Sequence, residues 1–183
     1  KQHKELKDKN QEIVELYKQG AVVNNTNNIS INIFLRDHCK DAMNLKDFVN
    51  NIKLSLDDLD YTGKNGFSKG IAQILLKNLS YIEPTNRPIH CTDKKRLQFY
   101  VKDANKWEKD NGNKKLDESI NDVTNKQYSQ LEDWKRENKD YINHPNKMIE
   151  YFQIVQSCVP NENEKVIKIM ADTQSKSLSK MNK

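Results

Sequence analysis

The sequence has few glycines, prolines and cysteines and no long apolar run. Its 183 residues include five glycines, four prolines and three cysteines. No stretch approaches the roughly 18 apolar residues that span a bilayer, and the start, KQHKELKDK, lacks a signal peptide. An odd, sparse cysteine count argues against a disulfide framework and for a reducing compartment. We therefore expect an intracellular protein without a membrane span. The missing initial Met predicts that the chain continues a longer polypeptide.

Patterns that accompany catalysis are also missing. None of the five glycines lies in a phosphate-cradling or oxyanion-type loop. Two His-Cys pairs occur, but neighbouring side chains on a strand point to opposite faces, so a metal site would need one member from each pair. We predict no enzymatic activity, no cofactor and no metal site, with the cysteines as buried apolar residues. The residues concerned are His38, Cys39, His90, Cys91 and Cys158.

Positive charge is concentrated in one segment. The chain carries 31 Lys and Arg against 26 Asp and Glu, a net charge of +5. Residues 87–115 hold nine basic and four acidic residues, so this segment alone accounts for the excess. A local excess of this kind is typical of a surface that binds an anion such as nucleic acid. The alternative is a solvated wing whose lysines only keep the protein soluble.

Apolar spacing divides the chain into four parts. Residues 1–20 fit the end of a coiled coil that mediates self-association, or a single amphipathic helix on the domain. Residues 21–28 have the composition of a linker, residues 29–160 form the main domain, and residues 161–183 form a C-terminal helix and a mobile tail. The stripe predicted to mediate oligomerisation consists of Leu6, Ile13, Leu16 and Tyr17.

Within the main domain, alternating isoleucines predict a short strand at residues 28–35. Helical spacing then predicts helices in 37–54, starting at Asn44, and in 54–63. A core helix at 68–82, capped by Ser68, has the strongest apolar stripe. Two further helices are expected at 114–137 and 147–158. The core-helix stripe consists of Ile71, Ile74, Leu75, Leu79 and Ile82.

A basic hairpin follows the core helix. Residues 87–92 and 97–103 alternate like strands, with DKKR as the turn, and residues 104–110 add a short third strand or turn anchored by Trp107. A helix followed by such a hairpin is the outline of a winged helix. The predicted fold is therefore α+β, mainly α-helical, with a winged-helix-like domain.

The hairpin supplies the candidate nucleic-acid contacts. Lys94, Lys95 and Arg96 occupy the tip, where they would meet phosphates, and Tyr100 and Lys102 are predicted to face outward. The core helix carries only Lys69 and Lys77, which favours backbone contact over base reading. The full predicted set is Arg87, Lys94, Lys95, Arg96, Tyr100, Lys102 and Lys106.

The blocks INIFLRDHCKDAMNLKDFVNNI, LDDLDYTGKNGF and RPIHCTDKKRLQFYVKDANKWEKD occur in this order. This series resembles a family of uncharacterised proteins from giant nucleocytoplasmic large DNA viruses, and the likeness covers residues 29–145. The resemblance implies a viral origin, a preceding coiled coil and an upstream Cys/His zinc-finger-like segment. It implies no assigned activity.

These observations lead to two functional hypotheses. The first is an oligomeric viral protein that contacts nucleic acid, DNA in the first place, through the basic hairpin, located in the host cytoplasm, the viral factory or the virion. The second is a scaffolding component of the virion or viral factory that acts through contacts with other viral proteins.

Overall fold

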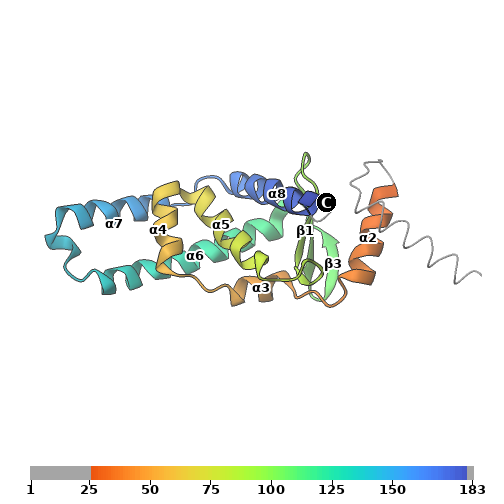
Figure 1. Ribbon diagram of the computed structural model, residues 1–183, viewed down its shortest axis with the longest axis horizontal. Helices are drawn as coiled ribbons and strands as arrows, with labels where there is room; N and C mark the ends of the chain where they lie inside the picture. The colour runs from red at the N-terminus through yellow and green to blue at the C-terminus, as the bar shows by residue number, and fades with distance from the viewer. Residues whose placement is uncertain (1–25, 181–183) are drawn as a thin grey trace, which may run out of the picture.

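The computed structural model describes residues 26–180 (Figure 1). The predicted coiled-coil end, with Leu6, Ile13, Leu16 and Tyr17, lies outside these residues. The fold is α+β and mainly helical, as predicted. The helices are α2 (Thr26–His38), α3 (Leu45–Asn51), α4 (Leu56–Asn65), α5 (Phe67–Ser80), α6 (Lys114–Glu137), α7 (Pro145–Ser157) and α8 (Asn163–Lys180). The strands are β1 (Ile89–Asp93), β2 (Gln98–Asp103) and β3 (Lys106–Lys109).

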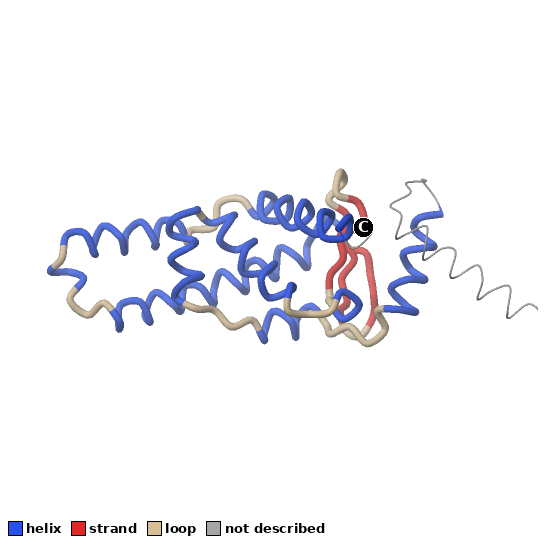
Figure 2. The backbone as a smooth tube through the Cα atoms, in the orientation of Figure 1, coloured by secondary structure: helices blue, strands red, loops and turns tan. Residues whose placement is uncertain are grey.

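The three strands form an antiparallel sheet in the order β1-β2-β3. Ile89 pairs with Val101 and Cys91 with Phe99, and a bulge follows Cys91. Figure 2 shows the sheet between α2 on one side and the other helices on the other. Side chains alternate between these two sides, because successive residues of a strand point to opposite faces.

The main core lies on the side of the sheet away from α2. Ile89, Cys91, Phe99 and Val101 pack there against α3, α5, α6 and α8. The predicted core helix is confirmed as α5, and all but Ile82 of its stripe are buried. The C-terminal helix contributes to the same core through Val166, Ile167, Met170 and Ala171.

Helices α4, α5 and α6 meet at Thr62. The hydroxyl of Thr62 donates to Asp58 O (3.0 Å) and accepts from Gln127 Nε2 (2.7 Å). A Cβ atom placed on Gly70 of α5 would lie 2.1 Å from Thr62 Oγ1, so this glycine permits the close approach of α4 and α5. Between these helices, Gly66 has φ +84°, a left-handed conformation that favours glycine.

The predicted strand at residues 28–35 is wrong, because these residues belong to α2. Residues 26–28 of the predicted linker are helical as well. The isoleucine alternation is short, and the same segment also has helical spacing. Ile31, Leu35 and Cys39 follow one another at intervals of four, and all three pack on the second face of the sheet.

Other element predictions differ mainly at their ends. The predicted strands of the hairpin and the helices at 54–63 and 114–137 are present, and α3 begins after Asn44 as expected. Ser68 lies inside α5, whose N-cap is Gly66. Helix α8 continues to Lys180, through residues predicted to be a mobile tail. Within residues 26–180, no helix is long and apolar enough to cross a bilayer.

Substitution Gly70→Ala is expected to lower the free energy of unfolding by about 3 kcal/mol, because the added methyl overlaps Thr62. Urea denaturation followed by circular dichroism measures this loss. The matched control is Gly63→Ala, whose methyl would meet the side chain of Ile154, with Cγ1 2.8 Å away and more able to move. Adding Thr62→Ala should recover part of the loss. Equal losses for the two glycines would contradict the close-approach argument.

Candidate nucleic-acid interface

The turn between β1 and β2 holds three consecutive basic residues at the surface. We call Lys94, Lys95 and Arg96 the basic turn; all three are exposed. The backbone N–H of Arg96 donates to Asp93 Oδ1 (3.0 Å), and this hydrogen bond stabilises the turn from the residue that precedes it. Leu97 follows with φ +50° and is half-buried. In Figure 1 the turn extends beyond α8.

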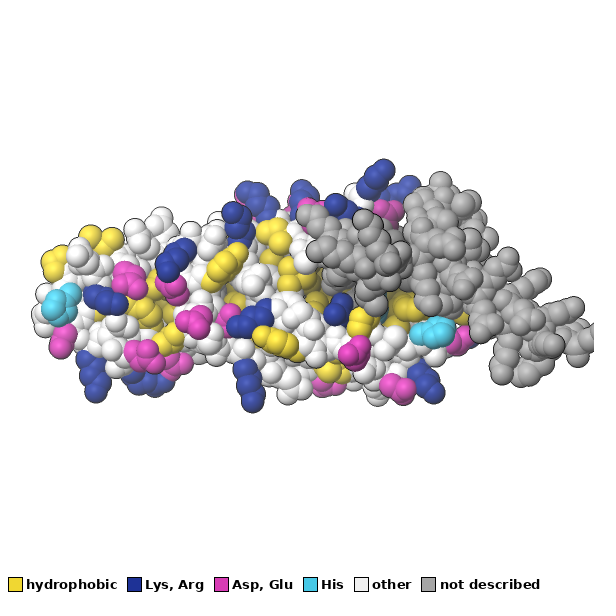
Figure 3. All heavy atoms as spheres, viewed as in Figure 1, with side chains coloured by type: hydrophobic (Ala, Val, Ile, Leu, Met, Phe, Trp, Pro, Cys, Tyr) yellow, Lys and Arg dark blue, Asp and Glu magenta, His cyan; other side chains and the backbone are white. Residues whose placement is uncertain are grey.

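Two carboxylates moderate the charge of the basic turn. Lys94 Nζ lies 2.9 Å from Asp172 Oδ1 of α8, and an Arg96 guanidinium nitrogen lies 3.7 Å from Asp93 Oδ2. Both pairs are solvent-exposed, so each contributes little stability and is weakened by salt. A phosphate could therefore replace these carboxylates at small cost. Figure 3 shows basic side chains gathered along this edge of the molecule.

Two predicted contacts lie at the other end of the sheet. Arg87 precedes β1 and Lys106 begins β3, so each lies about 20 Å from the basic turn along the strands. Arg87 is half-buried and its Nε donates to Ile82 O (2.9 Å), which stabilises the chain after α5. Lys106 is exposed. The structure does not bring either residue together with the basic turn.

The prediction that Tyr100 and Lys102 face outward is wrong. They do point away from the main core, but α2 covers that face of the sheet, and their exposed fractions are 6% and 5%. Lys102 Nζ donates to Lys40 O and Ala42 O, both at 2.6 Å. These carbonyls follow the C-terminus of α2, where a cation is favourable. Lys102 is therefore a buried helix-end contact.

Trp107 reinforces the same contact. Its indole Nε1 donates to Cys39 O at 3.0 Å, and on the sheet it lies opposite Lys102. Both faces of the sheet are thus covered by helices. The basic turn and the strand edges are the parts of the sheet that remain for binding.

One further lysine of the basic segment, Lys115, is neutralised locally. Lys115 forms ion pairs with Asp103 and, at 2.9 Å, with Glu108. These carboxylates raise the pKa of Lys115 well above its ordinary value. The +5 excess of residues 87–115 is therefore not one continuous patch, and the basic turn is its most accessible part.

His90 and Cys39 form the one juxtaposition that could suggest metal or nucleophile chemistry. Cys39 Sγ lies 3.8 Å from His90 Nε2, and the imidazole also contacts Phe34 and Trp107. Burial, with the charge of Arg87 acting in the same direction, lowers the pKa of His90 to about 4. Burial raises the pKa of Cys39 to about 11, so its thiol stays protonated at neutral pH.

No third ligand completes a metal site in residues 26–180, where no group of three His, Cys, Asp or Glu side chains is arranged to hold an ion. All three cysteines are buried free thiols, as predicted. Burial likewise raises the pKa of Cys91 to about 12 and that of Cys158 to about 11. The cysteines therefore act as apolar core residues.

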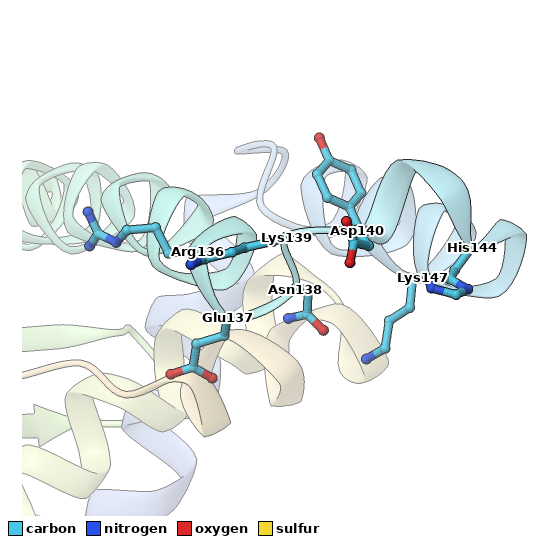
Figure 4. Close-up of a pocket in the computed structure, with 8 residues that line it drawn as sticks. Arg136, Glu137, Asn138, Lys139, Asp140, His144 and Lys147 are labelled. Carbon is cyan, nitrogen blue, oxygen red and sulfur yellow. The ribbon is translucent and has the colours of Figure 1, made fainter.

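A shallow hollow of about 340 Å³ lies where α6 turns into α7. Its lining includes Arg136, Lys139 and Lys147 together with Glu137 and Asp140. In Figure 4 these charged groups diverge: Lys139 extends toward Arg136, whereas Lys147 points away from both. Since no set of polar groups converges on one point, the hollow is not a ligand site.

Comparison of the chain with protein-family models, curated proteins and solved structures found no match. The arguments for the interface are therefore the geometry and charge of the basic turn.

Substitution Lys102→Met is expected to lower the free energy of unfolding by about 2 kcal/mol, because two charged hydrogen bonds to the end of α2 are lost while the apolar stem is kept. Urea denaturation measures the change. The folded variant should bind nucleic acid like the wild type. Unchanged stability together with weaker binding would instead make Lys102 a contact residue.

Lowering the pH from 7 to 4.5 is expected to cost about 2 kcal/mol of stability through His90. The folded-state pKa near 4 lies below the unfolded value of about 6.5, so only the unfolded chain takes up the proton in this window. Substitution His90→Gln should remove this part of the pH dependence, while His38→Gln, at an exposed position, should retain it. Urea denaturation across the pH range measures both. Identical pH curves for wild type and His90→Gln would contradict the assignment.

Proposed function

We propose that the protein is a nucleic-acid-associated protein that contacts the phosphate backbone through the basic turn. The observation behind this proposal is a set of three adjacent, exposed cations. They lie on the turn of a hairpin whose two faces are covered by helices. Phosphate contact needs accessible positive charge in a fixed position, and the turn provides it. Helices cover both faces of the sheet beside the turn, which favours binding without base recognition.

The finer predictions belong to the same proposal. A winged-helix-like arrangement would use α5 and the hairpin together, with the hairpin turn as the wing that grips the backbone. A coiled coil formed by residues 1–20 would place several turns on one nucleic acid. The resemblance to a family of giant DNA viruses supports a viral protein of the factory or virion.

Charge reversal at Lys94, Lys95 and Arg96 to Glu should weaken binding at least about tenfold and reduce the salt dependence. Three lost phosphate contacts would change the slope of log affinity against log salt by about 3. The measurement is fluorescence polarisation with a labelled 20-base-pair duplex at several salt concentrations, with circular dichroism to confirm folding.

The matched control reverses Lys53, Lys64 and Lys139, which are exposed and lie outside α5 and the hairpin. It makes the same change in net charge away from the turn. An equal loss of affinity in both triple variants would show that net charge alone causes binding. Unchanged affinity in the turn variant would reject the proposed interface.

A scaffolding role is the second candidate function, and one observation favours it. Several large apolar side chains of α7 and its flanks are exposed, at the end of the molecule away from the sheet. Exposed apolar clusters on a folded protein commonly mark protein contacts.

A further inference from the structure

Helix α7 has apolar residues on two opposite faces. The inner face, with Ile154 and Cys158 buried, packs against α4 and Trp134. Tyr151 adds ring contacts with Trp134, at 5.4 Å between centroids. This inner face accounts for the packing of α7 against the rest of the molecule. It does not account for the apolar residues on the other face. A helix that is apolar all round is normally buried all round.

We call the second side the outer face of α7, and it consists of Met148, Ile149, Phe152, Val155 and Val159. Four of these side chains are exposed: Phe152 by 61%, Ile149 by 54%, Val159 by 51% and Met148 by 37%. Figure 3 shows apolar side chains at this end of the molecule. The nearby Ile142, exposed by 66%, extends the apolar surface beyond the helix.

The spacing of the outer face suits helix pairing. Met148, Phe152 and Val155 follow at intervals of four and three residues, the spacing of side chains that interdigitate between two paired helices, and Val159 lies two residues beyond the end of α7. Such a stripe runs along the helix rather than around it. A flat apolar stripe of this length accepts another helix more readily than a loop or a small ligand.

The lack of charge on the outer face indicates which kind of partner it can bind. Residues 151–159 contain no charged side chain, and the preceding Lys147 and Glu150 pair with each other at 3.2 Å. Two copies of this face therefore meet without like-charge repulsion. A strongly charged partner helix would find no complementary charge on the face itself. The face is thus complementary to itself.

The area is adequate for a weak dimer. If the four exposed residues of the outer face and the nearby Ile142 each contribute about 100 Å², two copies bury about 1,000 Å² in total, the lower bound for specific interfaces. An interface of this size is typical of weak, transient association. In Figure 1, α7 lies at one end of the long axis, away from the sheet and α2, so a second copy can approach it.

We propose that the outer face of α7 binds the same face of a second copy of this chain as an antiparallel, two-fold symmetric helix pair. The inference rests on the second candidate function and is independent of the basic turn. In this arrangement the middle of the stripe, near Phe152 and Val155, lies at the two-fold axis, because an isologous contact brings each residue near its own symmetry mate there.

Sedimentation velocity of the full chain between 1 and 200 µM tests the association. The wild type should shift from monomer toward dimer, or from a smaller to a larger assembly where residues 1–20 also associate. The double substitution Ile149→Glu with Phe152→Glu should weaken this step at least tenfold. The matched control is Tyr81→Glu, an aromatic residue exposed by 76% on another element, which should leave it unchanged.

Cysteine crosslinking tests the two-fold geometry. All three native cysteines are buried, so Val155→Cys, close to the proposed two-fold axis, supplies a thiol that would lie near its own symmetry mate. Mild oxidation should join two copies through this residue, with each thiol losing one hydrogen to the added oxidant, oxidised glutathione. The control Gln73→Cys, exposed on α5, should not crosslink under the same conditions.

Three results would overturn the proposal. They are a concentration-independent mass, an association that the double substitution leaves intact, and equal crosslinking at positions 73 and 155. A face that binds a different protein or a lipid surface would give the first of these. Duplex binding by the same variants distinguishes the two proposals. Charge reversal at the basic turn should abolish DNA contact without affecting the dimer. Substitutions in α7 should abolish the dimer, while the separate protomer still binds DNA.

Discussion

The contact between Lys102 and the end of α2 determines what the sheet can do. The ammonium group donates to two backbone carbonyls in the segment that follows the helix, and Trp107 donates to a third. Held in this way, α2 buries the face of the sheet that the main core does not cover. A small sheet with two covered faces is rigid, but it has little surface left for binding. The turn between β1 and β2 is then the natural position for an electrostatic contact.

Much of this arrangement could be predicted from the sequence, and the exceptions share one cause. The long helix α6 was predicted to its ends from a sparse apolar stripe that follows the Asn111–Asn113 loop. In the structure, Asp110 accepts hydrogen bonds from the first backbone N–H groups of this helix. The alternation along β2 correctly predicted that Tyr100 and Phe99 point to opposite faces of the sheet. Exposure was predicted wrongly because α2 had been taken for a strand, and no local pattern in β2 could reveal a covering helix. The basic turn needed no such information, because polar turns lie at the surface.

The two sides of α7 illustrate the same limit. Its apolar residues are evident in the sequence, but a helix with apolar residues on both sides does not indicate which side its own chain covers. The structure assigns Ile154 to the interior and Phe152 to the surface. This choice follows from the aromatic group formed by Trp134, Tyr141 and Tyr151, which joins α6 to α7. The exposed side is therefore a consequence of long-range packing.

The two proposed surfaces lie toward opposite ends of the molecule and would support each other energetically. Three cations form a weak contact, and five apolar side chains form a weak dimer. A dimer through α7 would carry two basic turns, and once one turn binds a nucleic acid the second binds at a high effective concentration. Because a nucleic acid offers many equivalent phosphates, the second turn needs no particular sequence to bind. Two weak contacts on one rigid protomer can therefore produce a stable assembly on nucleic acid, while each remains reversible alone.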